Sequence, residues 1–285
     1  MRILITGSAG MLGQDVWAAA AAAGHEAIAL SRSELDVTDA AAVDAALSRE
    51  RPEVLVNCAA WTDVDGAEAA YAAALAVNGP GAGNLAAAAS ASGAWTIHVS
   101  TDYVFDGSKQ GPYVESDRVA PLSAYGRSKL DGELAVAQAA PERHTIVRSS
   151  WLFGAGGPCF PATILRLAAE RDELTVVDDQ IGCPTFTGHL AGAIVELAGA
   201  RADPAVGILH VAGAGHCSWY ELAQKIVATA GLSCEVRPGA TADLGRPAPR
   251  PAYSVLGTER ESQAPRLPHW HEGLAAFMAS GVPAR

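Results

Sequence analysis

Tyr125 and Lys129 are the residues best suited to acid–base chemistry, and they stand four positions apart in the segment YGRSK. On a helix this spacing places both side chains on one face, one turn apart. A free phenol has a pKa of about 10 and exchanges protons poorly near neutral pH. A neighbouring ammonium group favours the phenolate and lowers that pKa. The pair therefore predicts a proton donor and acceptor for interconverting a carbonyl and a hydroxyl group.

Thr101 supplies a second polar group that suits this chemistry. It follows residues 95–100 (WTIHVS), which are predicted to form the fourth strand, and Asp102 comes directly after it. In parallel α/β sheets, ligands bind at the carboxyl ends of the strands. We therefore expect the Thr101 hydroxyl to orient the same carbonyl group. Taken alone, Tyr125 and Lys129 are more typical of a helix with one half-buried phenol and one solvated ammonium than of a catalytic pair.

The first thirteen residues, MRILITGSAGMLG, supply the element that favours the chemical interpretation. An apolar run predicts a strand, and an Ala-rich helix is predicted to continue to Ala23. Gly7, Gly10 and Gly13 lie between them. Glycines there permit a tight turn, and the N–H groups at the helix start can face a phosphate. The spacing is G-x-x-G-x-x-G, and it predicts a dinucleotide-binding turn.

The ends of the second and third predicted strands complete the cofactor hypothesis. Ser31 and Arg32 end the second strand, where Arg32 can pair with a 2′-phosphate and slightly favours NADPH over NADH. Asp36 is a candidate acceptor for an adenine amino group, although Thr38 or Asp39 can equally cap the next helix. Ala59 and Ala60 follow the third strand at 54–57 and are small enough for close approach of a cofactor.

Strands and helices alternate over the first 150 residues, which predicts an α/β fold with a Rossmann-type, doubly wound parallel sheet. Helices are predicted at 65–78 and 79–92, and a long loop at 235–253. The pattern loosens after Trp151. We therefore expect a dinucleotide-binding domain at 1–150 and a smaller, interleaved substrate-binding lobe at 151–285, with about 174–212 returning to the first domain.

Composition excludes several classes of function. The net charge of -11, from 31 acidic and 20 basic residues, argues against binding to nucleic acid or to an anionic membrane surface. The five cysteines form no C-x-x-C pair, so neither a disulfide framework nor a metal site is expected. The chain begins directly with the first strand, and its Ala-rich runs are too short to span a bilayer. We expect a cytoplasmic protein.

The motifs together resemble the extended short-chain dehydrogenase/reductases, and within them the dTDP-4-dehydrorhamnose reductase family. The segments that carry the resemblance are spread over most of the chain in the family's order. They are TGSAGMLG (6–13), NCAAWTDVDGAE (57–68), VSTDYVFDG (99–107), YGRSK (125–129), VRSSWLFG (147–154), DQIGCPT (179–185) and RPAYSVL (250–256).

The resemblance implies Thr101, Tyr125 and Lys129 as the catalytic set. It implies hydride transfer from NADPH or NADH to C4 of a dTDP-4-keto-6-deoxyhexose, with dTDP-4-dehydrorhamnose reduced to dTDP-rhamnose as the first expectation. Implied cofactor contacts are Gly7, Gly10, Met11, Leu12, Asp36, Val37, Ala59, Ala60 and Lys129. Implied substrate contacts are Val104, Phe105, Trp151 and Gln180.

The chain also departs from the family's pattern. Some members dimerise through a magnesium cluster of glutamates, where this chain has Asp15 but Gly188 and His189 near the second position and no carboxylate at 282–285. We therefore expect no metal and either a monomer or a metal-free homodimer. Alternatives are a 4-ketoreductase of another dTDP-deoxysugar in antibiotic biosynthesis, a nucleotide-sugar epimerase or dehydratase, and a non-catalytic regulatory subunit of the same fold.

Overall fold

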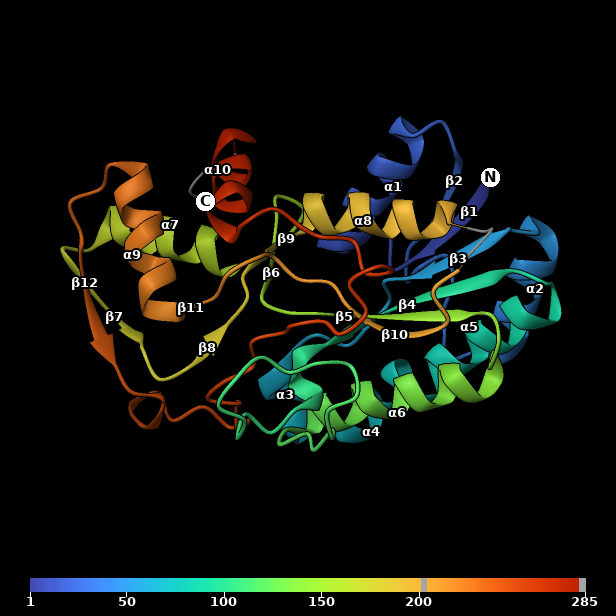
Figure 1. Ribbon diagram of the computed structural model, residues 1–285, viewed down its shortest axis with the longest axis horizontal. Coiled ribbons are helices and arrows are strands. Elements are labelled where there is room, and N and C mark those ends of the chain that lie inside the picture. The colour runs from blue at the N-terminus through green and yellow to red at the C-terminus, as the bar shows by residue number, and fades with distance from the viewer. Residues whose placement is uncertain (201–203, 282–285) are drawn as a thin grey trace.

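A six-stranded parallel sheet forms the centre of the molecule in the computed structural model, which describes residues 1–200 and 204–281 (Figure 1). In spatial order the strands are β10 (Gly207–His210), β5 (His144–Ser149), β4 (Trp95–Thr101), β3 (Val54–Asn57), β1 (Arg2–Thr6) and β2 (Glu26–Leu30). All five pairings are parallel. The predicted fold class is confirmed.

The strand order reverses at β1, because the chain adds β2 on one side of it and β3 on the other. Loops that leave such neighbouring strands in opposite directions open a crevice at their carboxyl ends. The glycine turn after β1 and the small residues after β3 both lie at this position. The sheet therefore brings the predicted cofactor segments together.

Helices cover both faces of the sheet. Successive side chains of β1 point to opposite faces, so neighbouring residues pack against different helix layers. Ile3 and Ile5 pack with α1 (Met11–Ala22) and α8 (Thr187–Gly199). Leu4 points the other way. That second face is covered by α2 (Ala40–Glu50), α5 (Pro80–Ala91) and α6 (Ala124–Ala139), with α3 (Val64–Ala69) and α4 (Tyr71–Asn78) against α6.

The prediction of one helix at 65–78 is wrong. Ala70 leaves the helical conformation, with φ of -126° and ψ of 41°, and separates α3 from α4. The Asp63 side chain caps α3 by accepting a hydrogen bond from the Gly66 N–H. Nothing in the alanine-rich sequence around the break marks it, because alanine favours an unbroken helix.

A smaller lobe, on the left in Figure 1, has its own apolar core between α7 (Phe160–Glu170), α9 (Trp219–Ala230) and α10 (Trp270–Ala279). Its strands β7 (Glu173–Val177) and β12 (Glu235–Gly239) pair in parallel. The predicted loop at 235–253 is therefore wrong over its first five residues. Pro238 and Gly239 suggested a loop, but an edge strand tolerates a proline, which has no N–H to pair.

Short elements connect the lobe to the sheet. They are η1 (Asp102–Val104), η2 (Thr241–Leu244), β6 (Leu152–Phe153) paired with β9 (Thr185–Phe186), and β8 (Ile181–Gly182) paired with β11 (Cys217–Ser218). Within the segment 174–212, α8 packs on α1 and β10 joins the main sheet, whereas β7 pairs with β12 in the smaller lobe. The tail at 282–285 lies outside the described residues. No helix in the described part of the chain has the length and apolar character needed to cross a bilayer.

Candidate active site

The carboxyl end of β4 and the first turn of α6 bring Thr101 and Tyr125 together. Ser123 caps α6 by accepting a hydrogen bond from the Gly126 N–H at 3.1 Å. A side chain at Gly126 would collide with the carbonyl oxygen of Tyr103, so this glycine allows α6 to approach η1. Tyr125 then packs edge-on against Tyr103, with 5.8 Å between the ring centroids.

Burial controls the acidity of the Tyr125 phenol. Burial raises the pKa of Tyr125 to about 12, hydrogen bonding with Thr101 lowers it, and the charge of Asp102 raises it further. The net shift is therefore opposite to the lowering expected from Lys129, because burial dominates. The Lys129 amine instead donates a hydrogen bond to the Val99 carbonyl oxygen at 2.7 Å. Tyr125 is therefore a neutral phenol at physiological pH, which is the form that a proton donor needs.

The glycine turn has the close packing expected of a dinucleotide site. Gly7 has a φ of +67°, and a Cβ there would lie 2.5 Å from the backbone nitrogen of Ala59. A Cβ at Gly13 would collide with the carbonyl oxygen of Gly7. Gly10 caps α1 without any side-chain hydrogen bond, so the first N–H groups of the helix, from Met11 onward, are open to an anion. The turn therefore fits a pyrophosphate.

The end of β2 holds the predicted adenosine-side residues. Ser31 closes a local turn, since its N–H and hydroxyl both donate to a Glu34 carboxylate oxygen, at 2.8 and 2.6 Å. Arg32 is exposed within this turn. Its guanidinium group can reach a phosphate beyond the strand end. Hydrogen bonds from Thr38 lower the pKa of Asp36, and the Arg32 charge adds a smaller contribution in the same direction.

The alternatives for residues 36–39 are separated by the hydrogen bonds. Asp39 caps α2 by accepting from the Ala42 N–H at 3.0 Å. Asp36 instead accepts from both the N–H and the hydroxyl of Thr38, at 2.9 and 2.7 Å. Val37 is buried beside α5. The Asp36 carboxylate is therefore already hydrogen-bonded to Thr38. A hydrogen bond to an adenine amino group would be additional to those two bonds.

Two of the four predicted substrate contacts do not fit that role. Val104 and Phe105 are both fully buried. Phe105 stacks on Tyr113 with 4.1 Å between ring centroids, and the Arg148 guanidinium lies 5.2 Å from its ring centroid. The prediction for these two side chains is corrected, because neither has any exposed surface to offer a ligand.

Trp151 and Gln180 form one unit with Trp219, a residue that the sequence analysis did not identify. Trp151 has a left-handed backbone with φ of +49° and stacks face to face on Trp219, with 3.5 Å between ring centroids. Gln180 accepts from the Trp219 indole N–H at 3.1 Å and donates to the Thr241 hydroxyl at 2.9 Å. The Gln180 amide is thus used in hydrogen bonds that position Trp219. Trp151 is partly exposed and is a member of this unit that a ligand can contact.

A second feature that the sequence analysis missed joins α3 to the segment RPAYSVL. The Asp65 carboxylate accepts two hydrogen bonds from Arg250, at 2.9 and 3.1 Å, and one from Arg246 at 3.1 Å. These bonds, led by Arg250, hold the pKa of Asp65 at about 2. Arg250 also hydrogen-bonds Tyr103. The motif pointed to Arg250, but only the fold shows which carboxylate meets it.

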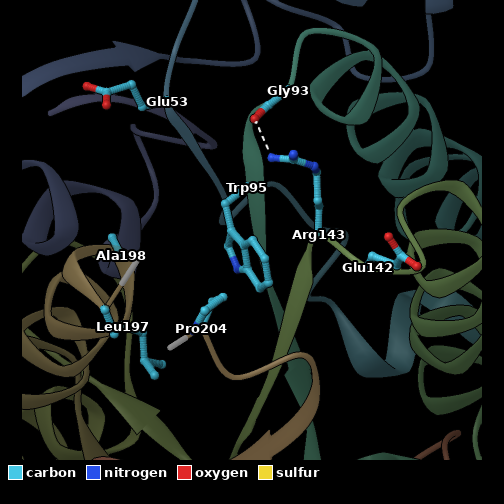
Figure 2. Close-up of a pocket in the computed structure, with 9 residues that line it drawn as sticks. Glu53, Gly93, Trp95, Glu142, Arg143, Leu197, Ala198 and Pro204 are labelled. Carbon is cyan, nitrogen blue, oxygen red and sulfur yellow. Dashed lines mark hydrogen bonds between the residues drawn. The ribbon is translucent and has the colours of Figure 1, made fainter. Parts of the chain in front are cut away.

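Figure 2 shows a pocket at the opposite, amino end of the sheet. Trp95 begins β4 and lines this pocket together with Glu53 and Leu197, while the Arg143 guanidinium donates to the Gly93 carbonyl oxygen at 3.0 Å. Since β4 runs from Trp95 to Thr101, the pocket is separated from Tyr125 by the length of the strand. It is not part of the candidate active site.

Comparison with known proteins agrees with this geometry. The family model described as "RmlD substrate binding domain" matches residues 1–282. The chain is 45% identical to a dTDP-4-dehydrorhamnose reductase of Streptomyces griseus over 96% of its own length and 91% of that protein. It is 42% identical to a dTDP-4-keto-6-deoxy-D-glucose reductase of Streptomyces niveus, covering 96% and 95% of the two chains.

Among solved structures, the chain resembles a dTDP-4-dehydrorhamnose reductase of Bacillus anthracis in complex with NADP. The TM-score is 0.94 at 36% sequence identity, and the match covers 98% of this chain and 99% of that one. The resemblance drawn from the sequence motifs is confirmed. The chain therefore belongs to the RmlD substrate binding domain family, whose members include the dTDP-4-dehydrorhamnose reductases.

Proposed function

We propose that this protein is an oxidoreductase that uses NADPH or NADH to reduce the C4 ketone of a dTDP-4-keto-6-deoxyhexose. Reduction of dTDP-4-dehydrorhamnose to dTDP-rhamnose is the first candidate reaction. The observation that carries the proposal is the position of the half-buried Tyr125 phenol, which is hydrogen-bonded with Thr101 at the carboxyl end of β4. The names of relatives at 42–45% identity support the same reaction.

Each catalytic residue has a distinct role in this proposal. The nicotinamide, when bound, supplies the hydride that reduces C4. Thr101 holds the carbonyl oxygen, and Tyr125 gives its proton to that oxygen as the ketone becomes an alcohol. Lys129, one turn further along α6, binds the nicotinamide ribose. The turn from Gly7 to Gly13 binds the pyrophosphate, and the exposed Arg32 favours NADPH by pairing with its 2′-phosphate.

The substrate side is assigned to the smaller lobe. We propose a dinucleotide-binding domain at 1–150, to which α8 and β10 return, and a substrate-binding lobe in the remainder of 151–285. The sugar contacts Trp151, which Trp219 supports through their stacked rings. Since NADPH and dTDP-sugars are charged metabolites of the cytoplasm, we place the protein there. It acts as a monomer or as a metal-free homodimer; residues 1–200 and 204–281 contain no group of side chains arranged to hold a metal ion.

The test is the absorbance of NADPH in the presence of enzymatically prepared dTDP-4-keto-6-deoxy sugars. Each sugar is supplied with and without prior epimerisation. Oxidation of NADPH only with the epimerised sugar identifies the rhamnose-forming reaction. Oxidation only with another keto sugar keeps the reductase and assigns it to a different deoxysugar. If NADPH binds but no sugar is reduced, the proposal is wrong and a regulatory subunit becomes the better hypothesis.

A second candidate follows from the Streptomyces niveus relative, whose name specifies dTDP-4-keto-6-deoxy-D-glucose. This sugar is the substrate before epimerisation, so the same assay separates the two reactions. Product analysis without added NADPH tests the epimerase alternative, because an epimerase recycles its own cofactor and consumes none. A net change of the sugar in that experiment contradicts the reductase assignment.

A further inference from the structure

A line of buried polar side chains runs behind the active site, from β1 across the sheet to α6. The Thr6 hydroxyl donates to the Asn57 side-chain oxygen at 2.8 Å. The Asn57 side-chain nitrogen lies 3.0 Å from Nδ1 of His98, and Nε2 of His98 lies 3.5 Å from the Lys129 amine. All four residues are at least 98% buried. The direction of each hydrogen bond therefore matters, because buried polar groups depend on one another for donors and acceptors.

The orientation of the Asn57 amide is fixed by a backbone group. The Ala59 N–H donates to one atom of this amide at 3.0 Å, and an N–H cannot accept a hydrogen bond, so that atom is the oxygen. The amide nitrogen consequently faces His98. Because this nitrogen is only a donor, Nδ1 of His98 must be the acceptor.

This assigns the tautomer of His98. Burial lowers the pKa of His98 well below its ordinary value, with a smaller contribution from the Lys129 charge and then from His144, so the ring is neutral. A neutral imidazole that accepts at Nδ1 carries its proton on Nε2. The Nε2–H bond thus faces the Lys129 amine. A donor placed there favours the neutral amine over the ammonium form.

We propose that His98 is a positioning residue for Lys129: Asn57 holds it in the Nε2–H tautomer, and the N–H that it presents weakens the affinity of the Lys129 amine for a proton. Other groups face this amine as well. Glu133, one turn along α6, and Cys58, after β3, favour the ammonium form, while burial opposes it and dominates. The relevance of Lys129 to catalysis rests on the proposed function, whereas the tautomer does not.

The tautomer is measured directly by NMR on the whole protein labelled in its histidines. We expect His98 to show the Nε2–H form at pH 7. His144 provides an internal contrast, because its Nδ1 lies 2.7 Å from the Ala140 carbonyl oxygen and must carry the proton. Substitution of His98 assigns its signals. An Nδ1–H tautomer or a charged ring at His98 would overturn the proposal.

The effect on Lys129 is measured by titrating the side-chain amines of protein labelled in its lysines. The chain contains only three, Lys109, Lys129 and Lys225, so the spectrum is simple. We expect Lys129 to titrate near pH 8, below the ordinary value of about 10.4.

His98→Asn keeps an acceptor for Asn57 and removes the N–H that faces the amine. We expect it to raise the pKa of Lys129 by about one unit, and the matched His144→Asn to leave it unchanged. An unchanged Lys129 pKa in folded His98→Asn protein contradicts the proposed role. Neither the tautomer measurement nor the amine titration requires a sugar. Absence of ketoreduction would therefore overturn only the proposed function.

Discussion

Near the carboxyl end of β4, Lys129 and Asp102 are buried and Tyr125 is half-buried, and loss of contact with solvent shifts each pKa toward the uncharged form. The pKa of Tyr125 rises to about 12, that of Asp102 rises to about 7, and that of Lys129 falls to about 8. Ser254 and Thr101 partly offset the shift of Asp102 by donating to its carboxylate, at 2.6 and 3.1 Å. Because the pKa values of Asp102 and Lys129 lie near 7 and 8, both groups are close to their titration points at physiological pH, while Tyr125 is protonated and can act as a proton donor.

Replacement of the phenol tests its role as the proton donor. Tyr125→Phe removes one hydroxyl and keeps the ring that packs on Tyr103. We expect kcat for NADPH oxidation with the keto sugar to fall by about 10²–10⁴-fold, because the alkoxide then lacks a positioned acid. The affinity for NADPH, measured by fluorescence titration, should change by no more than about twofold, because the lost hydroxyl acts on the substrate oxygen in the transition state. A normal kcat would show that another group supplies the proton.

Some site properties are not visible in a sequence because they depend on burial. The spacing of Tyr125 and Lys129 predicts their shared helix face, but the direction of the Tyr125 pKa shift depends on how much protein covers the ring. Likewise, Phe105 follows directly after η1 and looks the same in the sequence whether it faces a ligand or the core. Thr101 was predictable because the end of a parallel strand has a fixed place in the fold.

At the element scale, contact between the glycine turn and α1 sets the geometry of the cofactor site. Gly13→Ala places a methyl group against the carbonyl oxygen of Gly7, which is backbone and cannot rotate away. We expect a loss of about 1–3 kcal/mol in the free energy of unfolding, together with weaker NADPH binding. Urea denaturation and a binding titration measure the two effects.

The matched control for Gly13→Ala is Gly192→Ala in α8. A Cβ at Gly192 meets nothing within 4 Å. That variant should be neutral or more stable by up to about 1 kcal/mol, because alanine favours a helix over glycine. Equal losses in the two variants would mean that the tight contact at Gly13 is unimportant.

A buried ion pair joins α6 to β5 beneath the active site. Arg148 donates two hydrogen bonds to the Glu133 carboxylate, at 2.8 and 2.6 Å, and Ser100 donates a third at 2.5 Å. Both charged side chains are at most 3% exposed. Arg148→Met leaves the Glu133 charge buried without its partner, so we expect a loss of about 3–5 kcal/mol in unfolding free energy.

The double variant separates the cost of an orphaned charge from the value of the pair. With Glu133→Leu and Arg148→Met together, neither position leaves a charge without its partner, and we expect a loss well below the sum of the two single losses. Urea denaturation of the four proteins completes the cycle. Strict additivity would show that Glu133 and Arg148 stabilise the fold independently.

Secondary structure was most predictable where the apolar pattern is continuous. The buried strand at 54–57 agrees with β3 at both ends, since VLVN is apolar up to a single polar residue. The break at Ala70 and the strand β12 were missed for opposite reasons. An alanine run carries no signal for a helix break, and a proline in an edge strand imitates a loop.

At the scale of the whole molecule, Asp65 connects the first half of the chain to its last fifty residues. The side chains of Asp65 and Arg250 are 22% and 16% exposed, so their pairing is only partly screened by solvent. A carboxyl group with a folded-state pKa of about 2 and an ordinary value of 3.8 stabilises the fold above pH 4. That stabilisation disappears as the pH falls from about 4 to 2.

Asp65→Asn should therefore reduce the free energy of unfolding by about 2 kcal/mol at pH 7. The difference from the unchanged protein should shrink toward pH 2.5, where the carboxylate is largely protonated when unfolded. Urea denaturation at several pH values measures this convergence. Asp243→Asn, in the exposed η2, is the control and should have little effect. A pH-independent difference would mean that the carboxylate's charge contributes nothing.

The finished sheet protects its outer edge with side chains. β10 forms that edge, where the Ile208 carbonyl oxygen accepts from the Arg260 guanidinium at 2.7 Å. The His210 N–H donates to the Glu115 carboxylate at 2.9 Å. Unpaired strand edges recruit strands of other chains, so blocking these groups favours the correctly separated molecule.

The late position of β10 in the chain has a consequence for biosynthesis on the ribosome. β5 is complete at Ser149, but the strand that covers it ends at His210. At elongation rates of about 5–20 residues per second, the flank of β5 stays uncovered for roughly 3 to 12 seconds. Every nascent chain on one polysome passes through a stage in which this edge of β5 is uncovered. We therefore expect slower translation of the segment 150–210 to prolong that exposure and to lower the share of chains that reach the native state.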